Sequence, residues 1–250
     1  MKLIKIVFLG TNGWYDSPTG NTVSILIETD AASILLDAGN GLYKADRYIG
    51  NGKPVFLFIS HTHLDHIIGL HLLNKFEFKH GLKIYGQPGT IAALQTIINL
   101  PYSLPFANLS YPVDVAEFSG IYENREFSVQ TAELCHSVPT IGFRISINNK
   151  VITYCPDTGY CDNAVSLAQH ADLLIAECAF RTGEESEYWP HLNPETAARI
   201  ALEAHVKQLA LVHFDAHRYP TIESRVQAQA KARTIFSETV AASDEQVLEL

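Results

Sequence analysis

Short apolar runs separated by glycine, asparagine and aspartate turns dominate the first third of the chain. Their length and their content of aromatic and β-branched residues predict strands at 3–9, 22–29, 32–37 and 55–60. Apolar residues then recur with helical spacing at about 66–73 and 88–98. This part of the chain is therefore predicted to be rich in strands, with short helices placed after the fourth of them.

The second half alternates strand and helix patterns. Strands are predicted near 126–134, 141–147, 151–155, 172–177 and 208–212, and helices near 162–170, 194–204 and 223–238. The clearest helix is 194–204, because Asn193 can cap it, Pro194 suits its first position, and alanine and isoleucine residues form an apolar stripe along it. The whole pattern predicts an α/β protein.

Length and apolar content set the next limits. With 250 residues, 47% of them hydrophobic, the chain can bury a large core, and no repeat or linker divides it, so a single domain over 1–250 is expected. The apolar runs are strand-sized, far below the roughly 20 residues that cross a bilayer. The stretch Met1–Leu9 breaks at Gly10–Gly13, which predicts a first strand and a turn instead of a signal peptide. We therefore expect no membrane span and a cytoplasmic location.

Charge and cysteine content exclude further classes. The net charge of −9 disfavours a nucleic-acid partner, because binding to nucleic acid depends on Lys and Arg neutralising phosphates. The four cysteines form neither a CxxC pair nor a disulfide framework, and we expect them to be reduced, buried thiols. A small-molecule ligand is the expected partner.

The segment His61-Thr-His-Leu-Asp-His66 carries the strongest chemical signal. Three imidazoles and one carboxylate fall within six residues, directly after a predicted buried strand. In extended backbone His61 and His63 point the same way and can bind one ion, while Asp65 and His66 lie past the turn and face a second. Further on, His136, Asp157 and His213 also follow predicted strands, where loops can present side chains without disturbing the core.

These residues resemble the signature of the metallo-β-lactamase superfamily, HxHxDH followed by a distant His, a distant Asp and a final His. The resemblance covers most of the chain. It implies an αββα four-layer sandwich, in which His61, His63 and His136 hold one ion, Asp65, His66 and His213 hold the other, and Asp157 bridges them. Imidazole and carboxylate ligands suit two divalent ions, zinc first, with manganese or iron as alternatives. The resemblance also places Asp37, after a strand, as a buried structural acid or a partner of a ligand.

Within that superfamily, several segments are similar to the ribonuclease Z and small phosphodiesterase branch. They are 136–144, Pro156–Gly159, 172–180 and 191–198. In that branch a histidine placed like His191 acts as general acid or as a donor to the developing oxyanion. A positioned proton donor helps to expel an alkoxide from a phosphodiester, and histidine has a suitable pKa for it. Asp65 can orient the attacking water as well as bind metal, and Glu177 is either a partner of His191 or a structural acid.

Two departures limit the resemblance. Ribonuclease Z commonly inserts a long tRNA-binding arm between its His and its bridging Asp, whereas His136 and Asp157 are close in this sequence. The related cyclic-phosphate phosphodiesterases carry a cysteine-rich zinc site that this chain lacks. Relatives often form dimers, so a homodimer is also considered, with the apolar stretch Leu100–Phe106 as its interface or as a pocket wall.

The leading hypothesis is a dinuclear metal-dependent phosphodiesterase acting on a small or cyclic phosphodiester, with catalytic roles for Asp65, His191 and Glu177. A second hypothesis is the hydrolysis of a carboxylic ester, thioester, lactone or sulfate ester, since the same ions polarise a carbonyl equally well. A third is a non-catalytic sensor, which would require a missing ligand.

Overall fold

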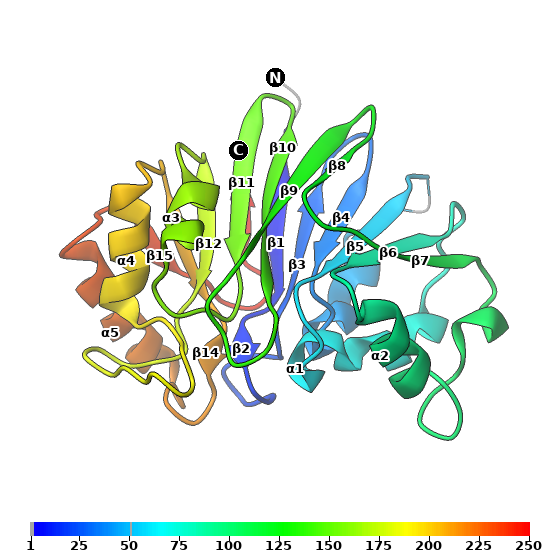
Figure 1. Ribbon diagram of the computed structural model, residues 1–250, viewed down its shortest axis with the longest axis horizontal. Coiled ribbons are helices and arrows are strands. Elements are labelled where there is room, and N and C mark those ends of the chain that lie inside the picture. The colour runs from blue at the N-terminus through cyan, green and yellow to red at the C-terminus, as the bar shows by residue number, and fades with distance from the viewer. Residues whose placement is uncertain (1–2, 51) are drawn as a thin grey trace. The chain divides into compact units, whose positions relative to one another are not determined.

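The structure, a computed structural model, describes residues 3–50 and 52–250; Met1 and Lys2 of the stretch weighed as a signal peptide lie outside them. The chain divides into two compact units. Unit 1 comprises Met1–Gly10, Asn21–Ser119 and Asp244–Leu250, and unit 2 comprises Thr11–Gly20 and Gly120–Ser243. Each unit contains one seven-stranded mixed sheet (Figure 1). The single domain expected from the sequence stays a prediction.

The sheet of unit 1 has the strand order β16-β1-β3-β4-β5-β6-β7. Pairing is antiparallel from β16 to β4 and parallel from β4 to β7. The strands are β1 Lys5–Gly10, β3 Ser24–Glu28, β4 Ser33–Leu36, β5 Val55–Ile59, β6 Leu82–Gly86, β7 Val113–Glu117 and β16 Val247–Glu249. All five side chains of β5 are buried, as its continuous run of apolar residues predicts for a parallel central strand.

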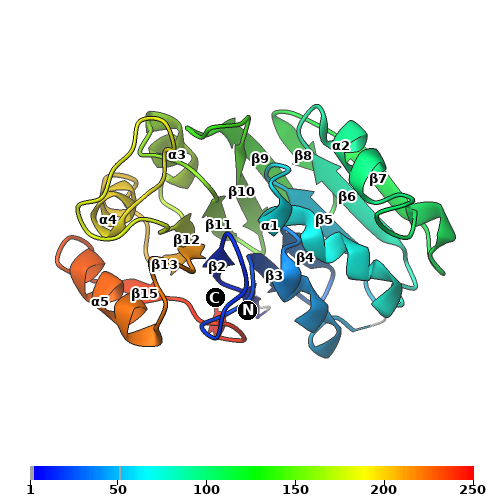
Figure 2. The same ribbon diagram turned by 90° about the horizontal axis from the view of Figure 1, so that it is seen from below.

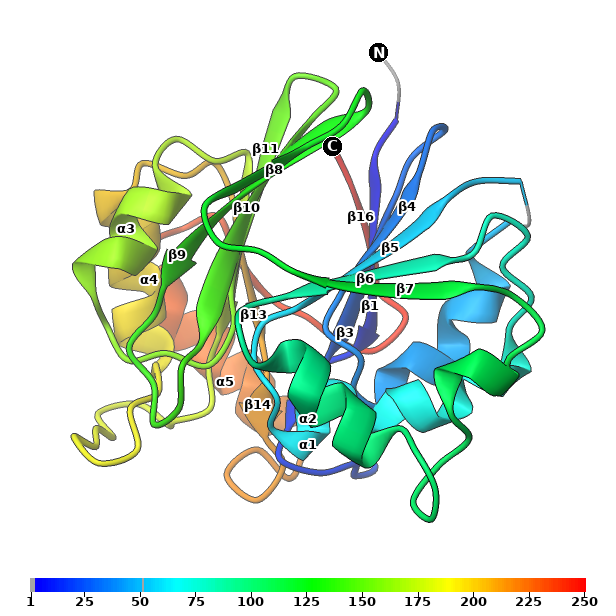
Figure 3. The same cartoon turned by 45° about the vertical axis from the view of Figure 1, so that its right-hand side comes forward.

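Helices of unit 1 pack on one face of this sheet (Figure 3). They are the α-helices α1 Leu64–Ile67 and α2 Thr90–Ile97 and the 3-10 helices η1 Asn40–Arg47, η2 Ile68–Lys75 and η3 Phe106–Asn108. Leu35, Leu57 and Leu82 contribute the sheet side of the core, and Leu42 and Leu70 contribute the helix side. This core fixes the base from which the histidine segment projects.

The sheet of unit 2 has the order β15-β13-β12-β11-β10-β9-β8, antiparallel from β8 to β11 and parallel from β11 to β15. Its strands are β8 Ile121–Glu123, β9 Phe127–Glu133, β10 Ile141–Ile147, β11 Lys150–Cys155, β12 Leu173–Glu177, β13 Leu209–Val212 and β15 Thr239–Ala241. A separate short pair joins β2 Asn12–Gly13 to β14 Phe214–Asp215. Three helices cover one face of the sheet (Figure 2): α3 Asp162–Ala168, α4 Pro194–Glu203 and α5 Ile222–Arg233.

Helix α4 forms for the reasons read from the sequence. The Asn193 side chain accepts a hydrogen bond from the Thr196 backbone N–H at 2.9 Å, and the Thr196 hydroxyl accepts one from the Asn193 N–H at 2.9 Å. Pro194 occupies the first helical position. This reciprocal cap satisfies two backbone donors and makes the start of α4 sharp, directly after His191 and Leu192.

Two helix predictions need correction. The helix predicted at 66–73 is one α-helical turn, α1, followed by the 3-10 helix η2. The Gly69 backbone N–H donates to the Ala38 carbonyl at 2.8 Å, so it does not continue the α-helical ladder. The helix predicted at 223–238 ends at Arg233, and β15 follows it.

The cysteine prediction holds only in part. Cys155 and Cys178 are buried, and burial raises the pKa of both thiols. Cys135 is exposed and Cys161 is half-buried, so burial was wrong for these two. All four thiols are free. As for membranes, none of the helices in the described ranges has both the length and the apolar character that a bilayer span needs.

Candidate metal centre

The seven predicted ligands are distributed over both units. His61, His63, Asp65 and His66 belong to unit 1, whereas His136, Asp157 and His213 belong to unit 2. The histidine segment, Asp157 and His213 follow the carboxyl ends of strands β5, β11 and β13, which have parallel neighbours, the edge at which α/β sheets place their ligand sites. His136 follows the antiparallel strand β9.

In unit 1 the histidine segment leaves strand β5 and turns into α1. His63 is extended, with φ −60° and ψ 145°, and precedes the first helical residue. The ring centroid of His61 lies 4.6 Å from that of His63 and 4.1 Å from that of His66. The Asp65 Oδ2 lies 3.7 Å from the His66 Nε2. Four ligand-type side chains thus gather at the end of one strand, as predicted.

Asp37 contacts Ser60 and His66 of this cluster through its carboxylate. Its carboxylate is fully buried and accepts hydrogen bonds from the Ser60 N–H and the Ser60 hydroxyl, each at 2.8 Å. The His66 Nδ1 lies 2.8 Å from the Asp37 Oδ2, and the His61 Nδ1 lies 3.0 Å from the Ser60 Oγ. With both Nδ1 atoms engaged, Nε2 is the atom each ring presents to a ligand, an arrangement common behind metal-binding histidines. Asp37 itself has the left-handed φ of 56°.

We expect Asp37→Asn to weaken metal binding by about 10- to 100-fold, because the amide offers N–H donors where His66 and Ser60 need acceptors. Asp46→Asn, at an exposed carboxylate paired with Lys75 in the same unit, is the control and should bind metal like the wild type. Competition with a chromophoric chelator measures both variants. Equal metal affinities would show that Asp37 serves folding alone.

In unit 2 three adjacent parallel strands deliver acidic and imidazole groups at one edge. Asp157 follows β11, Glu177 ends β12, and His213 follows β13. The Asp157 Oδ1 lies 3.1 Å from the His213 Nε2, and the Asp157 Oδ2 lies 3.6 Å from the His136 Nε2. Donor atoms of Asp157, His191 and His213 all lie within 4.8 Å of one another. Asp157 therefore has one oxygen toward each of two histidines, the disposition that a bridging carboxylate needs.

His136 is suited to ligation by its charge state. Burial lowers its pKa, and this effect outweighs the opposing influence of the Asp157 carboxylate. The His136 Nδ1 lies 3.3 Å from the Pro190 carbonyl, to which it donates when it carries the proton. A neutral imidazole with Nε2 available is the form that binds a metal.

Glu177 lies behind His191. Its side chain is fully buried, and its Oε1 lies 2.6 Å from the His191 Nδ1. The same oxygen accepts the Thr158 N–H at 2.9 Å, and Oε2 accepts the Ala179 N–H at 2.9 Å. Glu177 thus contacts His191, which is one of the two roles considered for Glu177 from the sequence. Because Glu177 engages Nδ1, Nε2 is the atom of His191 that can exchange a proton with a ligand.

Gly13 is a site residue that sequence reasoning missed, having been treated only as part of a turn. A Cβ built on Gly13 would lie 2.5 Å from the His213 Cε1 and 2.8 Å from its Nε2, much closer than van der Waals contact. His213 has a left-handed φ of 53°, so its backbone has little freedom to yield. The pairing of β2 with β14 brings Gly13 to this ring. No local sequence signal marks such a contact between distant residues.

Gly13→Ala is therefore expected to displace the His213 ring and to lower metal affinity at least about tenfold. This is the loss typical of mutations in the residues that orient a metal ligand. Gly50→Ala is the matched control, because nothing lies within 4 Å of a Cβ at Gly50. Metal content after dialysis and the melting temperature measure the two effects separately. Full metal occupancy in Gly13→Ala would contradict the predicted displacement.

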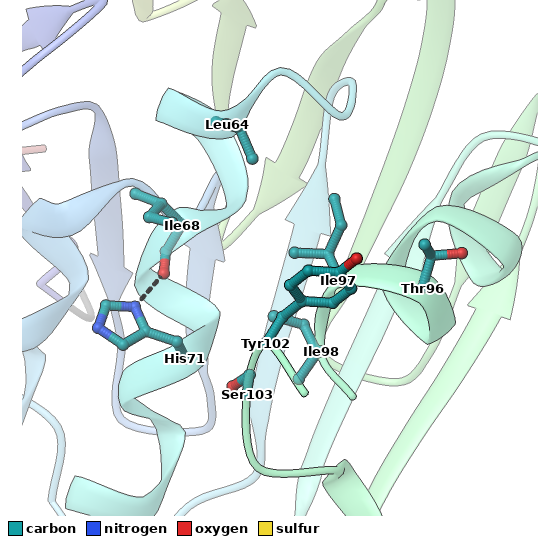
Figure 4. A pocket seen from close by; sticks show the side chains of 8 residues that line it. All are labelled: Leu64, Ile68, His71, Thr96, Ile97, Ile98, Tyr102 and Ser103. Atoms are coloured by element: carbon teal, nitrogen blue, oxygen red, sulfur yellow. Dashed lines mark hydrogen bonds between the residues drawn. The ribbon is translucent and has the colours of Figure 1, made fainter. Parts of the chain in front are cut away.

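An apolar cavity of about 460 Å³ adjoins the ligand segment in unit 1 (Figure 4). Leu64, which lies between the ligands His63 and Asp65, is one of its walls, and Ile97 and Tyr102 form the opposite side. Leu64 and Tyr102 are 59% and 75% exposed. Of the two roles considered for the stretch 100–106, a pocket wall is thus the one that Tyr102 takes in this structure.

The donor sets fit divalent metal ions. Unit 1 offers three imidazoles and one carboxylate, and unit 2 offers two imidazoles and one carboxylate, with hydrogen bonds fixing several of the rings. Nitrogen and oxygen ligands of this kind suit zinc, manganese and iron.

Comparison with known proteins agrees with this chemistry. A family model described as Beta-lactamase superfamily domain matches residues 32–214. Ribonuclease Z of Bacillus cereus (strain B4264) is 28% identical over 305 aligned positions, which cover 96% of this chain and 97% of that protein. Because 305 positions exceed the 250 residues of this chain, the relative contains insertions that this chain lacks.

Solved structures match over the full length. The metallo-β-lactamase fold protein YhfI from Bacillus subtilis has a TM-score of 0.83 and 25% identity, with 100% of both chains covered. A diphosphatase from the PhnP family has a TM-score of 0.76 and 17% identity, covering 99% of this chain and 98% of that one. The second likeness concerns the fold alone. The α/β class and the metallo-β-lactamase fold expected from the sequence are confirmed.

Proposed function

Because the chain belongs to the β-lactamase superfamily and has the metallo-β-lactamase fold, we propose that it is a dinuclear metal-dependent phosphodiesterase acting on a small or cyclic phosphodiester. The observation that carries the proposal is His191 held by the buried Glu177, within 4.8 Å of ligand atoms of Asp157 and His213. The metal ligands alone would suit any metal-dependent hydrolase. A proton donor fixed beside them favours a phosphodiester in particular, because an alkoxide leaving group must be protonated.

The proposed ligand assignment is the one that the superfamily pattern implies. His61, His63 and His136 would hold one ion, Asp65, His66 and His213 would hold the second, and Asp157 would serve both. When bound, two divalent ions would supply Lewis acidity and make water a competent nucleophile near neutral pH. We propose zinc, since imidazole and carboxylate suit it, with manganese and iron as the alternatives to test.

The residues of the chain divide the remaining work. His191 donates the proton of its Nε2 to the leaving oxygen, and Glu177 keeps the ring oriented and stabilises its charged form through Nδ1. Asp65, 8% exposed, orients the attacking water as well as binding metal. Asp37 and Ser60 hold the rings of His66 and His61 so that their Nε2 atoms need no reorganisation on binding.

A small diester is preferred over RNA for two reasons. The net charge of −9 weakens attraction to a polyanion, and only the short segment between His136 and Asp157 stands where ribonuclease Z commonly carries its tRNA-binding arm. The similarity to proteins named ribonuclease Z makes RNA the substrate to test against. A homodimer is compatible with this function, and the function does not depend on it.

The test is turnover by protein reconstituted separately with zinc, manganese and iron. The substrates are bis(p-nitrophenyl) phosphate, 2′,3′- and 3′,5′-cyclic nucleotides, and a precursor tRNA. The proposal expects metal-dependent hydrolysis of at least one small diester and little cleavage of the precursor. His63→Gln should abolish the activity, while His80→Gln, at an exposed histidine of the same unit, should retain it. Absence of turnover on every small diester with every metal would refute the proposal.

The apolar cavity favours one second candidate, hydrolysis of an ester or lactone with an apolar acyl group. Leu64, Ile68 and Ile97 would bind the acyl chain next to the ligands His63 and Asp65. This candidate predicts that p-nitrophenyl octanoate is hydrolysed with a kcat/KM at least about tenfold above that of p-nitrophenyl acetate, because burial of a few additional methylene groups stabilises the bound ester by that factor. Equal values for the two esters would exclude it.

A further inference from the structure

Both tryptophans of the chain lie together on the surface of unit 2. Trp14 and Trp189 are 64% and 38% exposed, their ring centroids are 6.2 Å apart, and the ring planes are perpendicular. Tryptophan is highly buried on average, because its ring carries a large apolar surface. A scattered exposed residue needs no explanation, but a pair that includes every tryptophan of the chain does.

The pair adjoins the proposed proton donor. The Trp189 ring centroid lies 5.5 Å from that of His136 and 6.0 Å from that of His191. His191 follows Trp189 by two residues, in the loop that leads to α4. If His191 protonates the leaving oxygen, Trp189 lies on the leaving-group side of the bond that breaks.

The loop that carries Trp14 is held in place from inside the unit. The Asn12 amide donates to the Tyr15 carbonyl at 3.1 Å, and the buried Arg225 donates to the Thr11 and Thr19 hydroxyls at 2.9 and 3.0 Å. Arg225 is 2% exposed. Trp14 has a left-handed φ of 74°, a conformation that a bulky residue keeps only where surrounding contacts impose it. Trp14 is therefore presented to solvent by a rigid loop.

We propose that Trp14 and Trp189 form a subsite for an uncharged planar aromatic group, such as a nucleobase, carried on the leaving-group side of the substrate. The placement of this subsite on the leaving-group side rests on the proposed function. The binding of an aromatic group by the two tryptophans does not. Flat aromatic surfaces stack on nucleobases of any sequence. A quaternary ammonium group also binds tryptophan, but here it would face the proton-donating His191 and the proposed metal ions, whose positive charge disfavours it.

Because the two tryptophans belong to the subsite, their intrinsic fluorescence reports binding directly. Metal-loaded protein is titrated with adenosine 5′-monophosphate, ribose 5-phosphate and phosphocholine. The proposal expects saturable quenching by the nucleotide, with affinity at least tenfold above that for the two ligands without a base. Equal affinity for ribose 5-phosphate would overturn it, and tighter binding of phosphocholine would assign the pair to a cationic group instead.

Variants locate the effect. Trp14→Leu and Trp189→Leu, followed by calorimetry, should each weaken nucleotide binding at least fivefold without lowering the melting temperature by more than a few degrees. Tyr188→Leu is the matched control, since Tyr188 precedes Trp189 in the same loop and is 93% exposed. A loss in Tyr188→Leu as large as in Trp189→Leu would contradict the assignment to the pair.

Turnover separates this inference from the proposed function. Both tryptophan variants should lose kcat/KM on adenosine 2′,3′-cyclic phosphate at least fivefold and keep it on glycerol 1,2-cyclic phosphate, which has no aromatic group. If the wild type hydrolyses neither diester, the proposed function fails, and the binding titration still decides the subsite. If both substrates lose activity equally in the variants, the subsite is wrong and the proposed function stands.

Discussion

Asp157→Asn is expected to lower kcat/KM by about 10³-fold or more and to reduce the metal content below two ions per chain, because a bridging ligand contributes to both ions. The Asp157 oxygens lie 3.1 Å from the His213 Nε2 and 3.6 Å from the His136 Nε2. An asparagine keeps the shape of the side chain but carries no charge, and its amide nitrogen cannot bind a cation. The substitution therefore removes the negative charge and one of the two ligand oxygens with little change in packing.

Inductively coupled plasma mass spectrometry of dialysed protein, together with turnover on the best small diester, measures this effect. Asp162→Asn is the matched control, since Asp162 is an exposed acid in the first turn of α3 in the same unit. The control should keep both metal content and activity within twofold of the wild type. An Asp157→Asn protein with two ions and normal turnover would remove Asp157 from the ligand set.

His191→Ala is expected to reduce kcat by about 10²- to 10⁴-fold on diesters that expel an alkoxide, the range for loss of a general acid. On bis(p-nitrophenyl) phosphate the loss should be far smaller, since p-nitrophenolate leaves without protonation. Metal content should stay unchanged, because none of the seven proposed ligands is altered. A uniform small effect on both kinds of leaving group would instead favour the ester-hydrolysis candidate.

Two further variants complete this test. His217→Ala replaces an exposed histidine of unit 2 and should leave both activities unchanged. Glu177→Gln keeps His191 but removes the carboxylate charge beside its Nδ1, so it should lower kcat on substrates that expel an alkoxide. It should also shift the alkaline limb of the pH profile, where a general acid loses its proton, to lower pH. A purely structural Glu177 would lower the melting temperature and leave the shape of the pH profile intact.

Local patterns allowed much of the fold to be predicted. The strand predicted at 141–147 coincides with β10, and the helix predicted at 194–204 differs from α4 by one residue. Both follow from signals within the segment, an apolar run in one case and a cap with a proline in the other. Strands β6, β7, β8, β15 and β16 were missed. The side chains of β7, β8 and β16 are half-buried or exposed, and β6 and β15 are short and carry no continuous apolar run.

Prediction failed where distant residues decide the outcome. The α-helix after His63 ends early because Gly69 bonds to Ala38 in another segment. Cys135 is exposed although cysteine is commonly buried, because it lies in the loop after β9. Such tertiary contacts override the preferences of single segments.

The candidate site divides in the same way. The cluster His61 to His66 was predictable, because its spacing alone places ligand-type side chains together. The contact between Glu177 and His191 could be offered only as one of two roles, since it joins the end of β12 to a loop after it. The approach of Gly13 to His213 and the pairing of Trp14 with Trp189 had no local signal, because each joins residues about two hundred positions or nearly that apart.

The proposed pair of metal ions can be located by anomalous diffraction from crystals of the metal-loaded protein, recorded at the absorption edge of the bound metal. We predict two peaks, one ligated by His61, His63 and His136, the other by Asp65, His66 and His213, with Asp157 in contact with both. A single ion, or two ions whose ligands all come from one unit, would contradict this prediction.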